Sequence, residues 1–451
     1  MTIRIKKNSY TAFGLLVALL LVLVFIRYAF SVEIPKAVLT AVLVAIAVVG
    51  NKNELMAVAL CCIPMHEAVD FYTSLALCAI IWVVKYHKSV RIGYPALLCM
   101  GIVVWETMHF FLTGFDLRLM ITSLIPFVFL AVILSSDISD IDYVFIVRAV
   151  AIVSATMGFM LLLNVIVNAR FNLVLAFANM QRLGHLSEED ILNGGAIHPN
   201  TLGIINVLSI TGLMQLRALK RSKKTDYVVI LLLIILGALT ASRTFFVCLL
   251  TMGFFLIVGE KGSTQKKLRM MAVLTLVAAV SLLLLYIFFP SSLEYYIGRF
   301  FVEDITTGRD DLMVAYHRFM TEHLWVLLFG VGLSGFGDKV VDIYRAAGNT
   351  PHNNIQEILV AWGIPGLLMM TALVATLVLR ARSFRRRGAM LNYIPLIIIL
   401  VKSLAGQMIS SGYTVLALVL AYLSLCQSFA GESPKTTVHS DYNAVPARTL
   451  L

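Results

Sequence analysis

Long apolar runs follow one another along almost the whole chain, and they constrain its fold more than any other feature. A helix that crosses a bilayer needs about 20 apolar residues. Only 14% of the 451 residues are charged, against roughly 25% in an ordinary soluble domain. The runs predict an all-α polytopic membrane helix bundle of about 12–14 spans. They lie at 11–30, 36–50, 54–68, 71–84, 93–112, 118–135, 142–168, 199–216, 227–241, 244–259, 270–289, 355–379, 391–410 and 412–429. The short runs 54–68 and 71–84 are tilted, re-entrant or one broken hairpin.

This composition excludes several classes of protein. Hydrophobic residues make up 60% of the chain, which excludes a soluble enzyme with one core and a disordered chain. The cysteines lie in apolar runs rather than in polar loops, which excludes a secreted disulfide scaffold. They are Cys61, Cys62, Cys78, Cys99, Cys248 and Cys426. The net charge of +11 does not indicate nucleic-acid binding, because most basic residues form short clusters between apolar runs.

These basic clusters orient the chain in the membrane. The positive-inside rule places them in the cytoplasm, and with them both termini. The clusters lie within 4–7, 85–91, 217–224, 261–269 and 380–387. The loop 136–142 is assigned to the same side although it carries no basic residue. The first run is interpreted as a retained helix rather than a signal peptide.

The expected organisation follows from this orientation. Its parts are 1–168, N-terminal transmembrane helices; 169–198, outer loop; 199–289, middle transmembrane helices; 290–354, large periplasmic or extracellular loop; 355–429, C-terminal transmembrane helices; and 430–451, cytoplasmic tail. The large loop has a helical signal between Arg309 and Leu328, where apolar residues recur at helical spacing. They are Leu312, Tyr316, Phe319 and Trp325. The pattern predicts an amphipathic helix on the outer membrane face.

Three arginines on the outer side are candidates for chemistry. Arg243 lies in a tight turn between two apolar runs, and it is either a snorkelling anchor or an anion ligand. Arg309 opens the loop helix. It is either a cationic group that binds an anionic substrate or a charge exposed to solvent in the loop. Arg182 lies in the first outer loop.

Two helix starts on the outer side share a histidine followed by asparagine. His198 and Asn200 open one helix, and His352 with Asn353 and Asn354 opens another. Asparagine caps helices, a helix N-terminus favours anions, and histidine can act as a base near neutral pH. The plainer interpretation is that these residues only cap their helices. Because the arginines and histidines share one side, we favour a cationic pocket suited to a pyrophosphate.

Other motifs are set aside. The segment 330–335 fits the dinucleotide pattern G-x-G-x-x-G, but it follows no strand and predicts a tight turn. The segment 66–70 lacks the second histidine of a zinc-protease motif. We expect no metal and no cofactor. Helix-end snorkelling is the interpretation for most charged or polar residues in or near spans, and Lys402 fits it least well. These residues are Glu106, His109, Arg148 and Lys402.

The ordered set of outer segments resembles the signature region of the O-antigen ligase and polymerase superfamily over roughly 180–370. The segments that carry the resemblance are 308–311, 328–337 and 352–367. Ser242 with Arg243 resembles the family's Ser-Arg element. Arg182 with the Pro-Asn pair at 199–200 resembles the loop before its middle helices. Asn354 and Ile355 depart from the family, where many members have a hydroxyl or acidic residue and then an aromatic one.

The resemblance implies an enzyme of the bacterial cytoplasmic membrane, with its active site on the outer face. Such enzymes move a glycan from an undecaprenyl-pyrophosphate carrier to an acceptor, here by inversion and without a metal. The implied catalytic residues are Arg243 and Arg309, which bind the pyrophosphate, and His352, a base or acceptor-orienting group. The implied substrate-binding residues are Arg182, His198, Asn200, Ser242, Asn353 and Asn354.

The resemblance also implies the partners. They are a lipid-linked oligosaccharide or polysaccharide donor, a glycan or lipid acceptor, the lipid bilayer and a chain-length regulator protein. We expect a polymerase of O-antigen, capsule or exopolysaccharide. A ligase that transfers the chain to a terminal acceptor stays open, as do a flippase or transporter and a structural subunit of an envelope complex.

Overall fold

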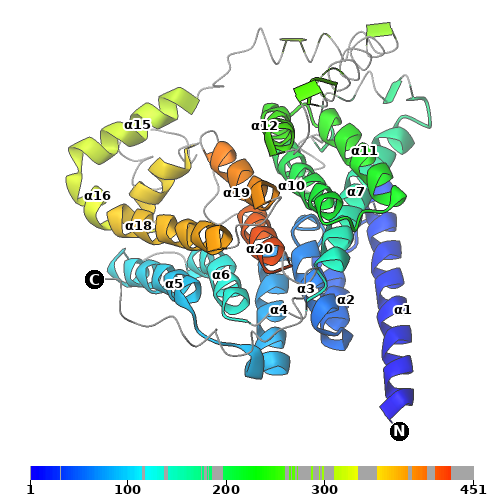
Figure 1. Ribbon diagram of the computed structural model, residues 1–451, viewed down its shortest axis with the longest axis horizontal. Coiled ribbons are helices and arrows are strands. Elements are labelled where there is room, and N and C mark those ends of the chain that lie inside the picture. Colours follow the sequence, from blue (N-terminus) through cyan, green and yellow to red (C-terminus); the bar gives the residue numbers. More distant parts are fainter. Residues whose placement is uncertain are drawn as a thin grey trace.

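The computed structural model of the chain is helical, and its described residues form no β-sheet, which confirms the predicted helical class (Figure 1). The description leaves out residues 1, 31, 114–116, 137–140, 174, 177–179, 181, 185–196, 260–263, 266, 270–271, 273–285, 288–293, 295–296, 299–308, 334–352, 384–388, 404–411 and 428–451. The predicted run 270–289 therefore lies almost entirely outside the described residues.

The helices follow the predicted apolar runs in order. Their bounds are α1 Thr2–Ala29, α2 Lys36–Val49, α3 Lys52–Cys61, α4 Phe71–Tyr86, the short 3₁₀ helix η1 His87–Ser89, α5 Tyr94–Thr113, α6 Leu117–Leu134, α7 Tyr143–Asn168, α10 Pro199–Ala218, α11 Lys224–Leu239, α12 Arg243–Gly259, α15 Arg309–Glu322, α16 Leu324–Phe329, α18 Asn354–Ser383, α19 Ala389–Ser403 and α20 Gly412–Gln427.

Among the described residues, four helices are long and apolar enough to cross a membrane. They are Thr11–Ala29, Tyr94–Leu112, Tyr143–Asn168 and Asn354–Leu379. Shorter apolar helices accompany them at Lys36–Val49, Met120–Leu134, Arg243–Val258, Tyr393–Ser403 and Thr414–Ser424. These helices are compatible with a membrane protein.

Polar residues in the connections determine where helices begin. Asn51 caps α3 in a capping box with Glu54. Asp70 accepts a hydrogen bond from Thr73 N at 3.3 Å and caps α4. Asp142 caps α7 in the same way. Each cap satisfies a backbone N–H that has no partner inside the helix, a contribution of about 1 kcal/mol relative to alanine.

The short runs 54–68 and 71–84 form one broken hairpin. The helix α3 has 10 residues, so it spans about 15 Å, half of a hydrocarbon core of about 30 Å. The turn 62–70 then leads into α4, and its residues Ala68 and Val69 are buried. Arg27 Nη1 of α1 donates to Ala68 O at 3.4 Å. Protein contacts therefore satisfy this non-helical backbone where it is buried.

The helices pack around a continuous apolar core that runs from α1 to α20. The helix α10 packs against α7, α11 and α12, whereas α18 packs against α5 and α16. Between these groups lies α19, in contact with α12, α18 and α20 (Figure 1). The starts of α10, α12 and α18 carry the residues singled out in the sequence.

Polar contacts gather several connections at one end of the bundle. Lys85 Nζ donates to Gly50 O at 2.6 Å, and Asp142 N donates to Asn53 Oδ1 at 2.7 Å. The second contact, together with a backbone bond between Arg91 N and the oxygen of residue 135, places the two described flanks of the non-basic loop at the same end as residue 91 of the basic cluster.

A second set of contacts gathers connections at the other end. Lys36 Nζ pairs with Glu67 Oε2 at 3.3 Å, and Asp70 N donates to Thr40 Oγ1 at 2.8 Å. The helices α2 and α4 each join a connection of one set to a connection of the other. Between residues 36 and 86 the chain therefore alternates between two ends of the bundle.

The amphipathic helix predicted between Arg309 and Leu328 is present as two helices, α15 and α16, which meet at His323. Tyr316 and Phe319 are buried, as the spacing predicted, whereas Trp325 is 46% exposed. The placement of this helix on a membrane face stays a prediction.

Candidate functional site

A tight, buried turn joins α11 to α12. Thr240, Ala241 and Ser242 are buried completely. Ala241 has a φ of 46°, in the left-handed region that residues with a side chain rarely adopt. Thr240 Oγ1 donates to Gly237 O at 2.6 Å, and Ser242 N donates to Thr240 Oγ1 at 3.3 Å. These contacts fix the direction in which α12 begins, and the predicted tight turn is confirmed.

Asn200 connects this turn to the start of α10. Its Oδ1 accepts hydrogen bonds from Arg182 Nη2 at 3.0 Å and from Ser242 Oγ at 2.9 Å. Arg182 Nε donates to Thr240 O at 2.9 Å. Three segments that are distant in sequence therefore meet at one amide oxygen. We name the residues Arg182, Asn200 and Ser242 the Asn200 bracket.

The bracket assigns Arg182 a role that the sequence did not suggest. Its Nε and Nη2 are bonded to the protein, so it holds the turn and Asn200 in place. Gly203 allows the close approach: a Cβ there would lie 3.0 Å from Phe245 Cβ and 3.4 Å from Ser242 Cβ. Such contacts leave α10 little freedom relative to α12.

His198 is the cap of α10. Its Nδ1 accepts a hydrogen bond from Asn200 N at 3.2 Å, and Pro199 occupies the first helical position. An accepting Nδ1 requires that a neutral ring carry its proton on Nε2. The plainer interpretation of this histidine, as a cap, therefore holds.

Arg243 is the first residue of α12 and is half-buried. The helices α10 and α12 start together and run parallel, because Gly203 meets Phe245 near their starts and Thr211 bonds to Met252 farther along. A helix N-terminus carries roughly +0.5 of an elementary charge. Two such termini beside one cationic side chain favour an anion at this place.

The start of α18 is also capped as predicted. Asn353 Oδ1 accepts from Ile355 N at 2.9 Å and from Gln356 N at 3.3 Å. Asn354 Nδ2 donates to Ser403 Oγ, at the end of α19, at 3.3 Å. Because α19 also packs against α12, it lies between the start of α18 and the Asn200 bracket.

Two of the predicted catalytic residues are not placed relative to this site. His352 lies outside the described residues. Arg309 opens α15, and its side chain lies outside them too. Their roles stay predictions.

The sequence interpretation was wrong about Glu106 of α5. This carboxylate is buried completely rather than snorkelling to an interface. Each of its oxygens accepts from Leu333 N at 3.0 Å, and Oε2 also accepts from Trp362 Nε1 at 2.7 Å. The available signal was an acidic residue within an apolar run, since such a residue needs partners inside the protein.

Trp362 adjoins a break in α18. Gly363 has a φ of 64° inside the helix, and the proline at 365 has no N–H to donate. The preceding carbonyls therefore lose their helical partners. Val331 N donates to the oxygen of residue 360 and Gly332 N to that of residue 361, both at 2.8 Å. Trp105 Nε1 donates to Trp362 O at 3.0 Å.

Gly330 and Gly332 make this pairing possible. Their φ values are 80° and 78°, and a Cβ on Gly330 would lie 2.2 Å from Ala361 O. The G-x-G-x-x-G pattern thus begins in a tight turn, as predicted. The described parts of two segments that carry the family resemblance, residues 330–333 and 360–363, contact each other here. We name the contacts among Glu106, residues 330–333 and residues 360–363 the α18 joint.

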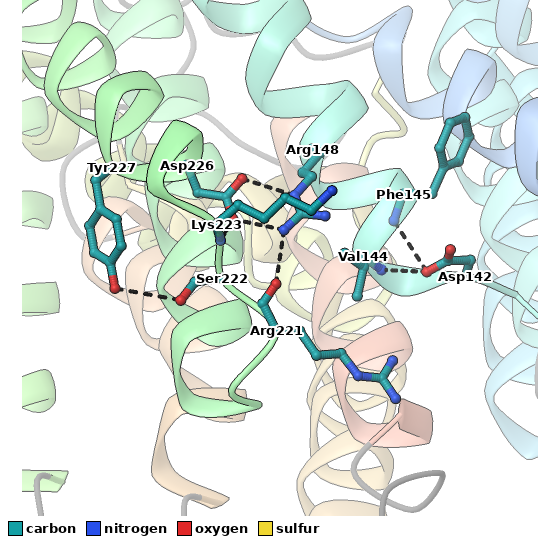
Figure 2. A network of polar contacts seen from close by, with 9 residues as sticks. All are labelled: Asp142, Val144, Phe145, Arg148, Arg221, Ser222, Lys223, Asp226 and Tyr227. Carbon is teal, nitrogen blue, oxygen red and sulfur yellow. Dashed lines mark hydrogen bonds and ion pairs between the residues drawn. The ribbon is translucent and has the colours of Figure 1, made fainter.

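A third polar group lies at the start of α11, whereas the Asn200 bracket adjoins its end. Figure 2 shows the residues of this group. Arg148 Nε donates to Asp226 Oδ1 and its Nη2 to Asp226 Oδ2, both at 2.9 Å, and Nη2 also donates to Arg221 O at 2.8 Å. Lys223 N donates to Asp226 as well. The hydrogen bond from Arg148 is the main cause that holds the pKa of Asp226 below its ordinary value. The head group of Arg148 near the start of α7 is thus paired with an acidic residue of α11.

Comparison with known proteins does not assign the chain to a family. No family model matches the chain, and the search of curated proteins finds no match.

Proposed function

We propose that the chain is a polytopic membrane glycosyltransferase that uses an undecaprenyl-pyrophosphate-linked donor. It acts at the outer membrane face as a polymerase of O-antigen, capsule or exopolysaccharide. The observation that carries this proposal is the convergence of Arg182, Asn200 and Ser242 beside Arg243. The sequence singled out these residues before any contact between them was known.

The charge of the site supports a pyrophosphate ligand. The N-termini of α10 and α12 meet beside Arg243, and each favours an anion. A guanidinium held by a rigid turn presents its donors at a fixed place. Fixed donors stabilise charge where it develops in the transition state, without reorganisation at the moment of reaction.

The proposed reaction is a direct displacement at the anomeric carbon. An acceptor hydroxyl oxygen forms a bond to that carbon, and the bond from the carbon to the pyrophosphate oxygen breaks. The electron pair stays with the leaving pyrophosphate, where Arg243 and Arg309 neutralise it. The hydroxyl proton passes to a base, for which the resemblance suggests His352.

The two ends of the bundle support the proposed topology. The Asn200 bracket lies at the end of α11 away from Arg148 and Asp226. The Arg148 end carries the basic cluster 217–224, which the positive-inside rule assigns to the cytoplasm. The site then faces outward, where lipid-linked glycans are assembled into chains.

The position of the arginines also favours an enzyme over a flippase or transporter. Transporter sites lie near the bilayer midplane, whereas Arg243 opens α12 and Arg182 contacts the residue that follows α11. A ligase would use the same donor chemistry with a different acceptor, and it is the second outcome of the experiment below.

The experiment is a glycan ladder from cells that lack the protein and receive the wild type or Arg243→Ala. Lipid-linked and acceptor-linked glycans are resolved separately. A polymerase leaves single repeat units on the acceptor when it is missing, whereas a ligase leaves long chains on the carrier. We expect Arg243→Ala to behave like the deletion.

The matched control is Arg217→Ala, at the far end of α10, where the arginine is exposed. It should restore the wild-type ladder. A normal ladder with Arg243→Ala would overturn the pyrophosphate assignment. A build-up of lipid-linked units on the cytoplasmic side would identify a flippase instead.

A further inference from the structure

The α18 joint is a second specialised structure, and the proposed chemistry does not use it. It joins α5 to residues far along the chain, with separations of 227 residues to Leu333 and 256 residues to Trp362. A charged carboxylate inside an apolar bundle is costly. The chain nevertheless has Glu106 at a fully buried position. We therefore ask which structural arrangement this side chain maintains.

A carboxylate suits this place because it only accepts hydrogen bonds. Leu333 N and Trp362 Nε1 both point their hydrogens at Glu106. An ionised carboxyl group offers lone pairs on both oxygens, whereas a protonated acid or an amide replaces one acceptor by a donor. The joint is therefore closed by one side chain that holds two separate segments of chain.

The joint fixes one end of the limb Asn354–Trp362, the part of α18 before its break. Two other contacts fix the start of that limb. Asn354 Nδ2 bonds to Ser403 Oγ, and Gln356 Nε2 donates to Met313 O of α15 at 3.1 Å. The limb has nine residues and is about 13 Å long. The contacts at both ends of the limb therefore determine its position relative to α19. Because α19 packs against α12, they also determine its position relative to α12.

We infer that Glu106 is a positioning residue for the transferase site. It acts through Trp362 and the turn 330–333, and it holds the limb so that Asn354 lies against α19, beside the helix that Arg243 opens. This inference rests on the proposed function only for its catalytic consequence. The structural consequence, a fixed distance between Asn354 and Ser403, can be measured without any glycan.

The test uses the full chain in membranes with Asn354→Cys and Ser403→Cys, oxidised with copper phenanthroline. The chain without the two new cysteines gives the background, because Cys62 and Cys78 adjoin each other and are free, and Cys426 is replaced by serine in every chain. The crosslinked fraction reports whether the limb is in place. It is compared in the Glu106→Leu and Glu106→Gln backgrounds.

We expect Glu106→Leu to lower the crosslinked fraction by about tenfold, the scale expected when buried donors lose their acceptor. Glu106→Gln keeps the shape and one acceptor oxygen, so its crosslinked fraction should be intermediate. Combining Trp362→Phe with Glu106→Leu should lower the fraction no further than Glu106→Leu alone, because both changes break the same hydrogen bond. In chains that retain Asn354 and Ser403, the length of the glycan should fall in the same order.

The matched control is Glu67→Leu, which removes a carboxylate that pairs with Lys36 outside the joint. It should leave the crosslinked fraction unchanged. A role confined to folding would lower the amount of protein but not the crosslinked fraction of the surviving molecules, and this result would overturn the inference. If Glu106→Leu does not accumulate, Glu106→Gln decides the same question.

The two proposals fail in different ways. If the wild type extends no glycan but Glu106→Leu abolishes the crosslink, the proposed function is wrong and the role of Glu106 in placing the limb stands. If glycan extension depends on Arg243 while Glu106→Leu leaves both crosslink and chain length unchanged, the inference about Glu106 is wrong.

Discussion

Asn200 shows how one side chain organises the candidate site. Its amide oxygen accepts from a guanidinium and a hydroxyl that come from separate segments, and its backbone N–H is bonded to the capping ring of His198. The sequence suggested that Arg182 and His198 bind substrate. In the structure Arg182 and His198 bond to the protein at this place, and the assignment of Arg243 to a ligand stays a prediction.

The role of Asn200 can be separated from its effect on stability. Asn200→Asp should retain both hydrogen bonds, and the one from Arg182 becomes charge-assisted and stronger. The added negative charge should repel a pyrophosphate, so chain extension should be lost while the melting midpoint in detergent is maintained. Asn200→Leu should lower both, by roughly 1–3 kcal/mol in stability. Normal extension by Asn200→Asp would argue against an anion at this site.

Ala241 offers a second residue-scale test. Its φ of 46° costs a residue with a side chain roughly 1 kcal/mol, and a β-branched residue more. Ala241→Gly should therefore be neutral or slightly stabilising in a thermal melt, whereas Ala241→Val should be clearly destabilising. An Ala241→Val protein as stable as the wild type would show that the turn does not constrain Arg243.

At the scale of the element, α18 is a helix that is interrupted at Gly363, where the backbone is not helical. Gly363 takes a conformation that alanine avoids, and a Cβ there would lie 2.8 Å from Leu328 backbone atoms. The proline and glycines around 362–366 were visible in the sequence. The partners of the freed carbonyls were not, because they come from the turn 330–333 and from Trp105.

Gly363→Ala should therefore destabilise the protein by about 1–3 kcal/mol, because strain and the lost joint act together. The matched control is Gly253→Ala in α12, where an added Cβ meets nothing within 4 Å. That change should stabilise by up to about 1 kcal/mol, through helix propensity. Equal melting midpoints for the two variants would contradict the account of the break.

The ion pair between Arg148 and Asp226 couples α7 to α11 and makes stability depend on pH. The folded-state pKa of Asp226 is lowered, mainly by the hydrogen bond from Arg148. Its contribution is therefore complete above the unfolded value of about 3.9 and is lost as pH falls through the folded value. The melting midpoint of Asp226→Asn should lie below that of the wild type at pH 7, and the two should converge below about pH 4. If the difference between the two melting midpoints does not change with pH, the ion pair between Arg148 and Asp226 does not stabilise the fold.

At the scale of the whole molecule, the sequence predicted the helical class and most positions of the described helices. Apolar runs and polar caps are local signals, so they can be read without a structure. The partners of Glu106 and Arg148 could not, because a contact over 256 or 78 residues depends on how helices pack. The sequence interpretation accordingly assigned these charges to snorkelling.

The proposed topology predicts which side of the membrane each loop faces. Leu173→Cys, an exposed position after α7, should react with an impermeant thiol reagent in intact cells. Lys224→Cys, exposed at the start of α11, should react only after the membrane is permeabilised. The chain without either substitution provides the background. Reaction of both positions from outside would overturn the assigned orientation.

The α18 joint also has a consequence for how the protein is made. Glu106 leaves the ribosome before Trp362, and at about 5–20 residues per second the separation of 256 residues corresponds to roughly 10–50 s. During that interval α5 carries Glu106 without the donors of Leu333 and Trp362. The α18 joint therefore cannot close until both of these residues have been synthesised, and a chain truncated before residue 333 cannot form it.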